Sequence, residues 1–287
     1  MAEIEASQVV KLRQVTGQGM MDCKKSLAES GGDMDKAVEI LRKKGLATLA
    51  KRAERETKEG LVVSKISADG KTAALASLCC ETDFVSRSDD FTKAAETLAQ
   101  CALACPADEG IDNLLATTVG GKKFGDILTE IVSKTGEKTQ VGDFAKYKLT
   151  GPGLITIYVH FNKKVGTMVE IDTDNDATAK ADSIKRVASD IAMHITATKP
   201  LAIDEKGISA ETIEQEKSIA AAQIKGKPAN IIEKIVEGKM KKFFTENCLL
   251  LQPFVKDNTK TVSQVLAEAA KQASGQACVK RFVRFEV

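Results

Sequence analysis

An order of two strands followed by a helix occurs twice in this chain, and this pattern restricts the fold more than any other. In the first copy, residues 61–66 and 71–80 read as strands that flank an Ala-Asp-Gly hairpin turn. In the second copy, residues 154–161 and 165–171 form the strand pair, and a helix follows at about 177–197. The sequence therefore predicts an α+β fold whose core holds two related subdomains with antiparallel strands.

The junction after the first strand pair carries an acid and a large ring, in Thr82-Asp83-Phe84-Val85. Either Ser88 or Asp89 can cap the helix that follows. A comparison of the two copies sets Phe84 opposite Asn175, so only the first copy has an apolar tip. Two interpretations of Phe84 stay open: a ring buried where the chain reverses, or a ring held out for a partner at a surface connection.

Residues 1–55 predict a compact module of three short amphipathic helices. Glycines at 17, 31–32 and 45 supply the helix stops. The apolar residues expected to meet in its core are Val9, Leu12, Leu27, Val38 and Leu41. Residues 48–58, rich in Lys51, Arg52 and Arg55, read as a solvated connecting helix, with a nucleic-acid patch as the alternative.

The later part of the chain predicts further helices. Residues 113–134 read as one helix, and residues 209–224 and 230–240 as an antiparallel helical hairpin. The hairpin has a narrow apolar seam of the coiled-coil type, which predicts a protruding arm. The predicted parts are a three-helix module at 1–55, a first core subdomain at 56–142, and a second at 143–287 with the hairpin at about 205–240.

Charge and cysteine content favour a protein-binding role in a reducing cytoplasm. The net charge of +2 is far from the basic excess of proteins that bind phosphate backbones, and no apolar run is long enough to span a membrane. Seven scattered cysteines argue against a disulfide framework, and a zinc site is disfavoured. Neither histidine lies near a nucleophile, and no phosphate-binding glycine loop occurs.

Several motifs, in order over nearly the whole chain, carry a resemblance to a known family. They are Thr16-Gly17-Gln18-Gly19-Met20-Met21-Asp22-Cys23-Lys24-Lys25, Thr82-Asp83-Phe84-Val85, Ala192-Met193-His194, Lys199-Pro200, Gly238-Lys239-Met240-Lys241-Lys242-Phe243, Gln252-Pro253-Phe254-Val255 and Arg284-Phe285-Glu286-Val287. With these motifs the chain resembles the elongation factor Ts family. The resemblance implies a non-enzymatic guanine-nucleotide exchange factor for elongation factor Tu, with a first module similar to ubiquitin-associated domains.

The resemblance also implies which residues contact the partner. Met20 and Met21 match an exposed pair that leans on the partner's G domain. Asp83 and Phe84, within Thr82 to Val85, match a wedge that disturbs the Mg²⁺ side of its nucleotide site. Gly136 lies in Thr-Gly-Glu where the family usually has Ile-Gly-Glu, and His160 matches a contact to another domain of the partner. The chain itself is expected to bind no cofactor, metal, nucleotide, nucleic acid or membrane, while its hairpin could pair two copies as a homodimer or a 2:2 complex.

Three rival functions make different predictions. An adaptor whose first module binds a peptide or a ubiquitin-like protein would leave nucleotide release by any GTPase unchanged. A thiol redox enzyme acting through Cys79 or Cys80 would lose activity on alkylation. A nucleic-acid binder using Lys51, Arg52, Lys241 and Lys242 would depend steeply on salt.

Overall fold

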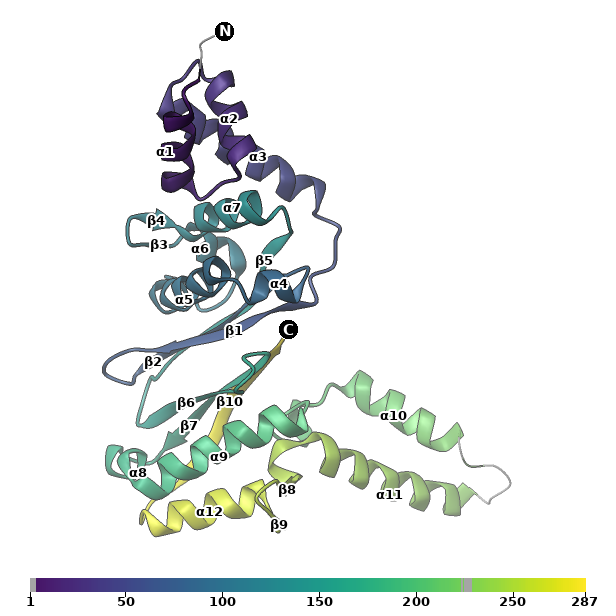
Figure 1. Cartoon of the computed structure of the whole chain (residues 1–287). Helices are drawn as coiled ribbons and strands as arrows, with labels where there is room; N and C mark the ends of the chain where they lie inside the picture. The colour runs from purple at the N-terminus through teal and green to yellow at the C-terminus, as the bar shows by residue number, and fades with distance from the viewer. Residues whose placement is uncertain (1–3, 223, 225–228) are drawn as a thin grey trace.

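Two three-stranded antiparallel sheets form the middle of the computed structural model, which describes residues 4–222, 224 and 229–287 (Figure 1). The first sheet has the strand order β1-β2-β5 and the second the order β10-β7-β6. Their strands are β1 (Glu59–Ile66), β2 (Thr72–Cys80), β5 (Thr139–Lys148), β6 (Gly153–Val159), β7 (Val165–Thr173) and β10 (Ala277–Glu286). Two short pairs lie outside them, β3 (Thr118–Val119) with β4 (Lys122–Lys123) and β8 (Pro253–Phe254) with β9 (Asp257–Thr261). The predicted α+β class is confirmed.

Helices cover the outer faces of both sheets and extend beyond them at two places (Figure 1). They are α1 (Ala6–Thr16), α2 (Met20–Glu29), α3 (Met34–Lys51), α4 (Asp83–Ser86), α5 (Asp89–Ala104), α6 (Ile111–Ala116), α7 (Phe124–Thr135), α8 (Asp176–Lys180), α9 (Asp182–Thr198), α10 (Ala210–Ala222), α11 (Ala229–Asn247) and α12 (Val262–Gln272). Short 3₁₀ turns, Glu205–Gly207 and Leu249–Leu251, flank α10 and α11.

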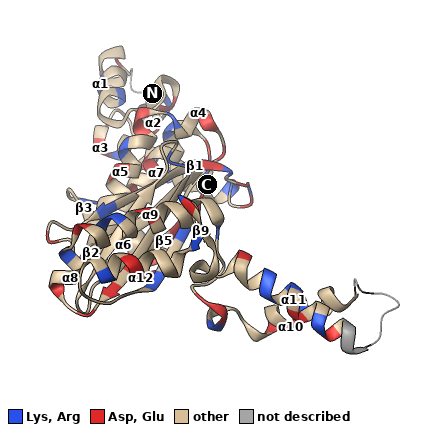
Figure 2. Cartoon of the chain, turned by 90° about the horizontal axis from the view of Figure 1, so that it is seen from below, with Lys and Arg blue, Asp and Glu red and all other residues tan. Residues whose placement is uncertain are grey.

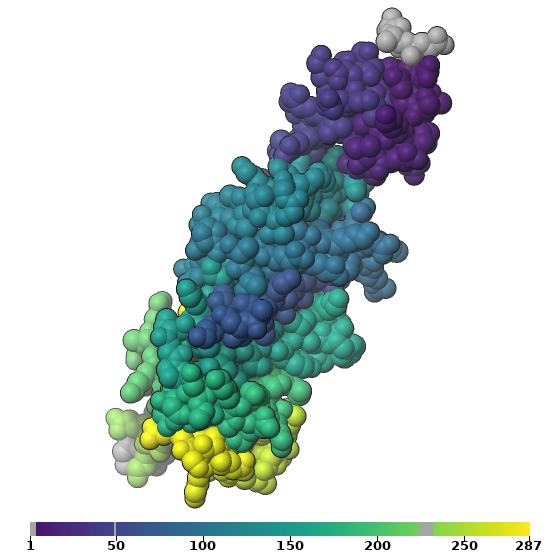
Figure 3. All heavy atoms as spheres, turned by 90° about the vertical axis from the view of Figure 1, so that its left-hand side faces the viewer, coloured from purple at the N-terminus to yellow at the C-terminus, as the bar shows by residue number. Residues whose placement is uncertain are grey.

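The core has four layers: helices, the first sheet, the second sheet, and helices again. Phe91 of α5 and Phe124 of α7 are fully buried against the outer face of the first sheet, and α9 and α12 cover the second. The inner faces of the two sheets meet in a third cluster around Leu75 and Met168. Gly166 allows this close approach, because an added Cβ would lie 2.8 Å from a methyl carbon of Val62. Figure 3 shows the stack from the N-terminal helices to α12.

The repeat is present in three dimensions, with a corrected alignment. Thr82 is the N-cap of α4 and Asn175 is the N-cap of α8, each directly after the central strand of its sheet. This correspondence sets Phe84 opposite Ala177, and not opposite Asn175 as the sequence comparison had it. The sequence comparison missed it because it matched the similar residues Glu81-Thr82-Asp83 and Asp172-Thr173-Asp174, which lie two residues away from the register of the strands and caps. Phe84 and Ala177 are both exposed, so the apolar tip still belongs to the first copy alone.

The three N-terminal helices share a core of their own and dock on α7. Val9, Leu12, Leu27 and Leu41 are buried there, whereas Val38 is 38% exposed beside a cavity of about 220 Å³ next to α7. Helix α3 does not stop at Gly45 as predicted but continues to Lys51. A Cβ at Gly45 would lie 2.8 Å from the carbonyl oxygen of Thr129, so this glycine permits close helix packing rather than a helix end.

Two other predicted elements differ from the structure. The single helix expected at 113–134 is split into α6 and α7, because Gly120 and Gly121 adopt φ of 62° and 83°, outside the helical region. Helix α11 runs on to Asn247, past the predicted end at Met240. The glycine-lysine-proline link expected between α10 and α11 and the side chain of Ile231 lie outside the described residues.

Helices α10 and α11 pack side by side and project from the core (Figure 2). Positions of Lys and Arg are interspersed with positions of Asp and Glu along the ribbon in the same view. None of the helices in the described ranges is long and apolar enough to cross a membrane. The boundaries drawn at residues 55 and 142, and the pairing of two copies through the arm, stay predictions.

Candidate functional site

The Thr82–Val85 turn presents one aromatic ring to solvent. Helix α4 is a single turn, so neighbouring side chains point in very different directions. Val85 is buried in the core of the first sheet, whereas Phe84 is 85% exposed. Asp83 is partly exposed and pairs with Arg87 at 3.1 Å. Of the two interpretations left open by the sequence, the structure supports the exposed ring.

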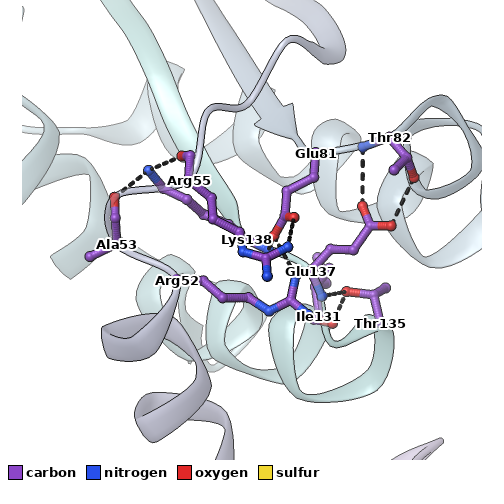
Figure 4. Close-up of polar contacts among 9 residues, drawn as sticks. All are labelled: Arg52, Ala53, Arg55, Glu81, Thr82, Ile131, Thr135, Glu137 and Lys138. Atoms are coloured by element: carbon purple, nitrogen blue, oxygen red, sulfur yellow. Dashed lines mark hydrogen bonds and ion pairs between the residues drawn. The ribbon is translucent and has the colours of Figure 1, made fainter.

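A carboxylate from a distant segment holds the base of this turn (Figure 4). Glu137 Oε2 accepts a hydrogen bond from the backbone N–H of Thr82 at 3.1 Å, and Oε1 accepts one from the Thr82 hydroxyl at 2.8 Å. Charged acceptors make the stronger hydrogen bonds in proteins. Sequence reasoning did not identify Glu137 as a site residue, because no local pattern links two positions so far apart.

A second carboxylate, Glu81, fastens the base of the turn to the link from α3 (Figure 4). It accepts hydrogen bonds from Arg52 at 2.7 Å, from Arg55 at 3.0 Å and from the backbone N–H of Lys138 at 2.6 Å. The Lys138 ammonium in turn donates to the carbonyl oxygens of Ala53 and Arg55. The connecting helix predicted for this stretch was wrong beyond Lys51, where α3 ends, and Arg52 and Arg55 after it pair with Glu81. The adjacency of Glu81 to the motif was the one sequence signal available.

Gly136 sets the path that brings Glu137 and Lys138 to the turn. It is the C-cap of α7 with φ 69° and ψ 6°, and its N–H donates to the carbonyl oxygen of Val132. Glycine suits this left-handed position because it carries no Cβ. In this structure Gly136 therefore turns the chain from the end of α7 toward Glu137 and Lys138, and its own residue is only partly exposed.

Met20 and Met21 open α2 on the N-terminal module. Their exposed fractions are 43% and 61%, so both side chains lie at the surface rather than one in the core. Cys23 and Leu27 of the same helix supply its buried face. An exposed pair of flexible thioethers is suited to an adaptable contact.

His160 lies in the turn between β6 and β7, at the same end of the two sheets as Phe84. Its Nδ1 is 3.0 Å from the hydroxyl oxygen of Tyr158, and its ring lies 4.5 Å from that of Phe161, which is 88% exposed. Lys164 of this turn forms an ion pair with Glu59, and Glu59 is the strand partner of Cys80. The fold thus brings the His160 turn near the Thr82–Val85 turn, while the methionines lie on the N-terminal module.

Sequence similarity to known proteins identifies the family of this chain. A family model described as Elongation factor TS matches residues 81–287. The elongation factor Ts of a Nitratiruptor species is 46% identical over 286 residues, covering 99% of this chain and 93% of the relative. This chain belongs to the elongation factor Ts family. The elongation factor Ts proteins of Chlorobium phaeobacteroides and Methylococcus capsulatus are 43% and 45% identical, over 100% and 99% of this chain and 99% and 92% of their own lengths.

Membership in the elongation factor Ts family confirms the family predicted from the motifs and supports a role in the elongation step of protein synthesis. One further feature of this family member counts against the thiol redox rival. Burial raises the pKa of the Cys79 thiol and raises that of Cys80 to about 12, so neither is poised as a thiolate. Among the described residues, no group of three or more His, Cys, Asp or Glu could hold a metal ion.

His194, the other histidine of this family member, is a packed core residue. It is fully buried, and its ring nitrogens lie 2.8 Å from Gln252 Oε1 and 3.2 Å from the backbone N–H of Val255. Burial lowers the pKa of its imidazole, so the ring is neutral and joins α9 to the segment after α11.

The Glu81 cluster predicts a pH-dependent stability. Burial alone would raise the pKa of Glu81, but hydrogen bonds from Lys138, Arg52 and Arg55 outweigh it and lower the pKa to about 2. Because this folded value lies below the ordinary value of 4.5, the stabilisation is present above about pH 4.5 and is lost as the pH falls toward 2. Glu81→Gln should remove on the order of 2 kcal/mol of this pH-dependent stability, measured by urea unfolding between pH 3 and 6.

The matched control is Glu39→Gln, which removes a carboxylate from an exposed helical pair with Lys43. Its unfolding profile should follow that of the wild type at each pH. If the free energies of unfolding of wild type and Glu81→Gln changed in parallel with pH, the pKa of Glu81 would be the same in the folded and unfolded chain, and the prediction would be wrong.

Proposed function

We propose that this chain binds elongation factor Tu carrying GDP and promotes the release of GDP, without performing covalent chemistry itself. The observation that carries the proposal is the exposed ring of Phe84 on a turn whose base is fixed by Glu137 and Glu81. A large ring that is already ordered loses little entropy on binding, and such rings are typical anchors of protein interfaces. The family resemblance supplies the partner.

In this mechanism Asp83 and Phe84 enter between helices of the partner's G domain and disturb the side of its nucleotide site that holds Mg²⁺. Thr82 and Val85 hold the turn from below, through the Glu137 contact and the buried core. A protein that binds the disturbed state best must weaken GDP by the same factor by which GDP weakens it. Each ~1.4 kcal/mol of this coupling changes nucleotide affinity about tenfold.

The remaining contacts add affinity in this proposal. Met20 and Met21 lean on the G domain from the N-terminal module, and His160 contacts a second domain of the partner. Gly136, the partly exposed C-cap of α7, offers its backbone to the partner beside the wedge. Binding energy from such remote contacts is available in every state of the complex, so it chiefly sets the concentration at which the factor works.

The proposal is tested by release of a fluorescent GDP analogue from purified elongation factor Tu in excess unlabelled GDP, with increasing amounts of this chain. Wild type should accelerate release. The Met20→Ala/Met21→Ala variant should need about tenfold more factor for half-maximal effect, because it loses a remote apolar contact, while the maximal rate changes little.

Val10→Ala is the control, since Val10 is an exposed apolar residue on the same module with an exposed fraction of 43%. It should behave as wild type. Equal behaviour of the methionine and valine variants would refute the methionine contact, and a wild-type protein that leaves GDP release unchanged would refute the proposed function and favour the adaptor.

A further inference from the structure

The hydroxyl of Thr82 is used in an unusual way for an N-cap residue. At this position a threonine side chain commonly accepts a hydrogen bond from a backbone N–H of the first helical turn. In α4 that cap is absent, and the hydroxyl instead donates to Glu137. The chain thus gives up a local cap and makes a contact across 55 residues of sequence.

The second copy of the repeat provides an internal comparison. There the N-cap Asn175 does cap its helix, accepting from the backbone N–H of Thr178. Strand pairing aligns the ends of the copies, because Cys80 pairs with Thr139 and Thr173 pairs with Ala277.

Two residues before those partners, the first copy has Glu137 and the second has Gly275. A Cβ at Gly275 would clash with the hydroxyl of Thr178, so no carboxylate fits there. The Glu–Thr contact therefore occurs only in the copy whose tip is Phe84.

Glu137 is itself held in place before any partner arrives. Its backbone N–H donates to the hydroxyl of Thr135 at 3.2 Å, and it follows the left-handed cap at Gly136. Its neighbour Lys138 is fixed by Glu81. Since both carboxylate oxygens of Glu137 are directed at Thr82, the contact restrains the position and the rotation of the turn (Figure 4).

We propose that Glu137 is a positioning residue for nucleotide exchange: its carboxylate holds Thr82 so that the Phe84 ring is presented in its working orientation. This role rests on the proposed exchange function. Without the contact, the turn samples other orientations, and ordering it becomes part of the barrier to GDP release. The restraint acts through hydrogen-bond geometry and not through a charge offered to the partner.

The experiment measures GDP release from elongation factor Tu with Glu137→Ala, Glu137→Gln, Thr82→Ala and the double alanine variant. Glu137→Ala should lower the maximal rate of GDP release about tenfold and change the half-saturating concentration less than about twofold. Loss of positioning slows GDP release within the complex, whereas the remote contacts that set affinity stay in place. Glu137→Gln should keep most of the rate, since its amide oxygen can accept from the Thr82 N–H while its NH₂ donates to the hydroxyl. The double variant should be no slower than the slower single variant.

Glu268→Ala is the control, because it removes an exposed carboxylate of α12 that pairs with Lys260 of β9. Wild-type rates for Glu137→Ala would overturn the proposal, as would a Glu137→Gln variant as slow as Glu137→Ala or additive losses in the double variant. If wild type itself fails to accelerate release, the exchange function fails, and this role fails with it. If Phe84→Ala is slower than wild type as expected while the Glu137 variants release GDP at the wild-type rate, only the positioning role fails.

Discussion

Phe84→Ala is expected to lower the maximal rate of GDP release from elongation factor Tu about 100-fold, of the order found for interface hot spots. The ring is 85% exposed, so its removal takes almost nothing from the core of the first sheet, which is anchored by the buried Val85. The thermal unfolding midpoint should therefore stay within about 2 °C of the wild type. Stopped-flow release of a fluorescent GDP analogue and a thermal melt measure the two effects.

Phe161→Ala is the matched control for this substitution. Phe161 is another strongly exposed phenylalanine, at 88%, and lies at the same end of the sheets. Its loss should change the maximal rate less than about threefold, since the wedge mechanism needs a ring on the Thr82–Val85 turn. Comparable losses for both variants would show that exposed aromatic surface matters and that the specific wedge does not.

Arg281→Ala is expected to lower the free energy of unfolding by about 3 kcal/mol, because it takes one partner from a buried charge. Glu170 is fully buried and accepts from Arg281 at 2.7 Å and from Lys280 at 3.0 Å. The Arg281 guanidinium also lies 4.0 Å from the ring centroid of Tyr147, on the facing sheet. The substitution thus weakens one sheet and its contact with the other, which urea unfolding at neutral pH would measure.

Two further variants test whether the loss of stability comes from the buried charge. Adding Glu170→Gln to Arg281→Ala should recover part of the lost stability, because a neutral amide replaces a buried carboxylate that keeps only Lys280 as its cationic partner. Lys260→Ala breaks an exposed pair with Glu268 and should cost less than about 1 kcal/mol. If Arg281→Ala costs no more than Lys260→Ala, then the buried pair does not contribute as argued.

Much of the local structure follows from sequence patterns. The turn signal at Asp69-Gly70 joins β1 to β2, and Ser88 caps α5 through the N–H of Phe91, as one of the two predicted caps. Glycines were harder to interpret. Gly45 matched a helix stop, but its absent side chain serves packing against α7, and only the tertiary structure distinguishes the two uses.

The candidate site was predictable only in part. Spacing could not decide whether Phe84 is buried, because a one-turn helix has no periodicity to read. The motif located the turn, but Glu137 and the Glu81 cluster depend on contacts between distant segments. Such contacts leave no local signal in one sequence.

The docking of α3 on α7 has a consequence for residence time on a partner. The Arg52 and Arg55 pairs with Glu81, and the packing of α3 on α7, connect the module that carries the methionine pair directly to the turn that carries Phe84. In the proposed complex, engagement of either patch would hold the other at a high effective concentration near its target. Dissociation then requires both patches to separate together, so loosening the α3–α7 junction should shorten the lifetime of the complex without altering either contact surface.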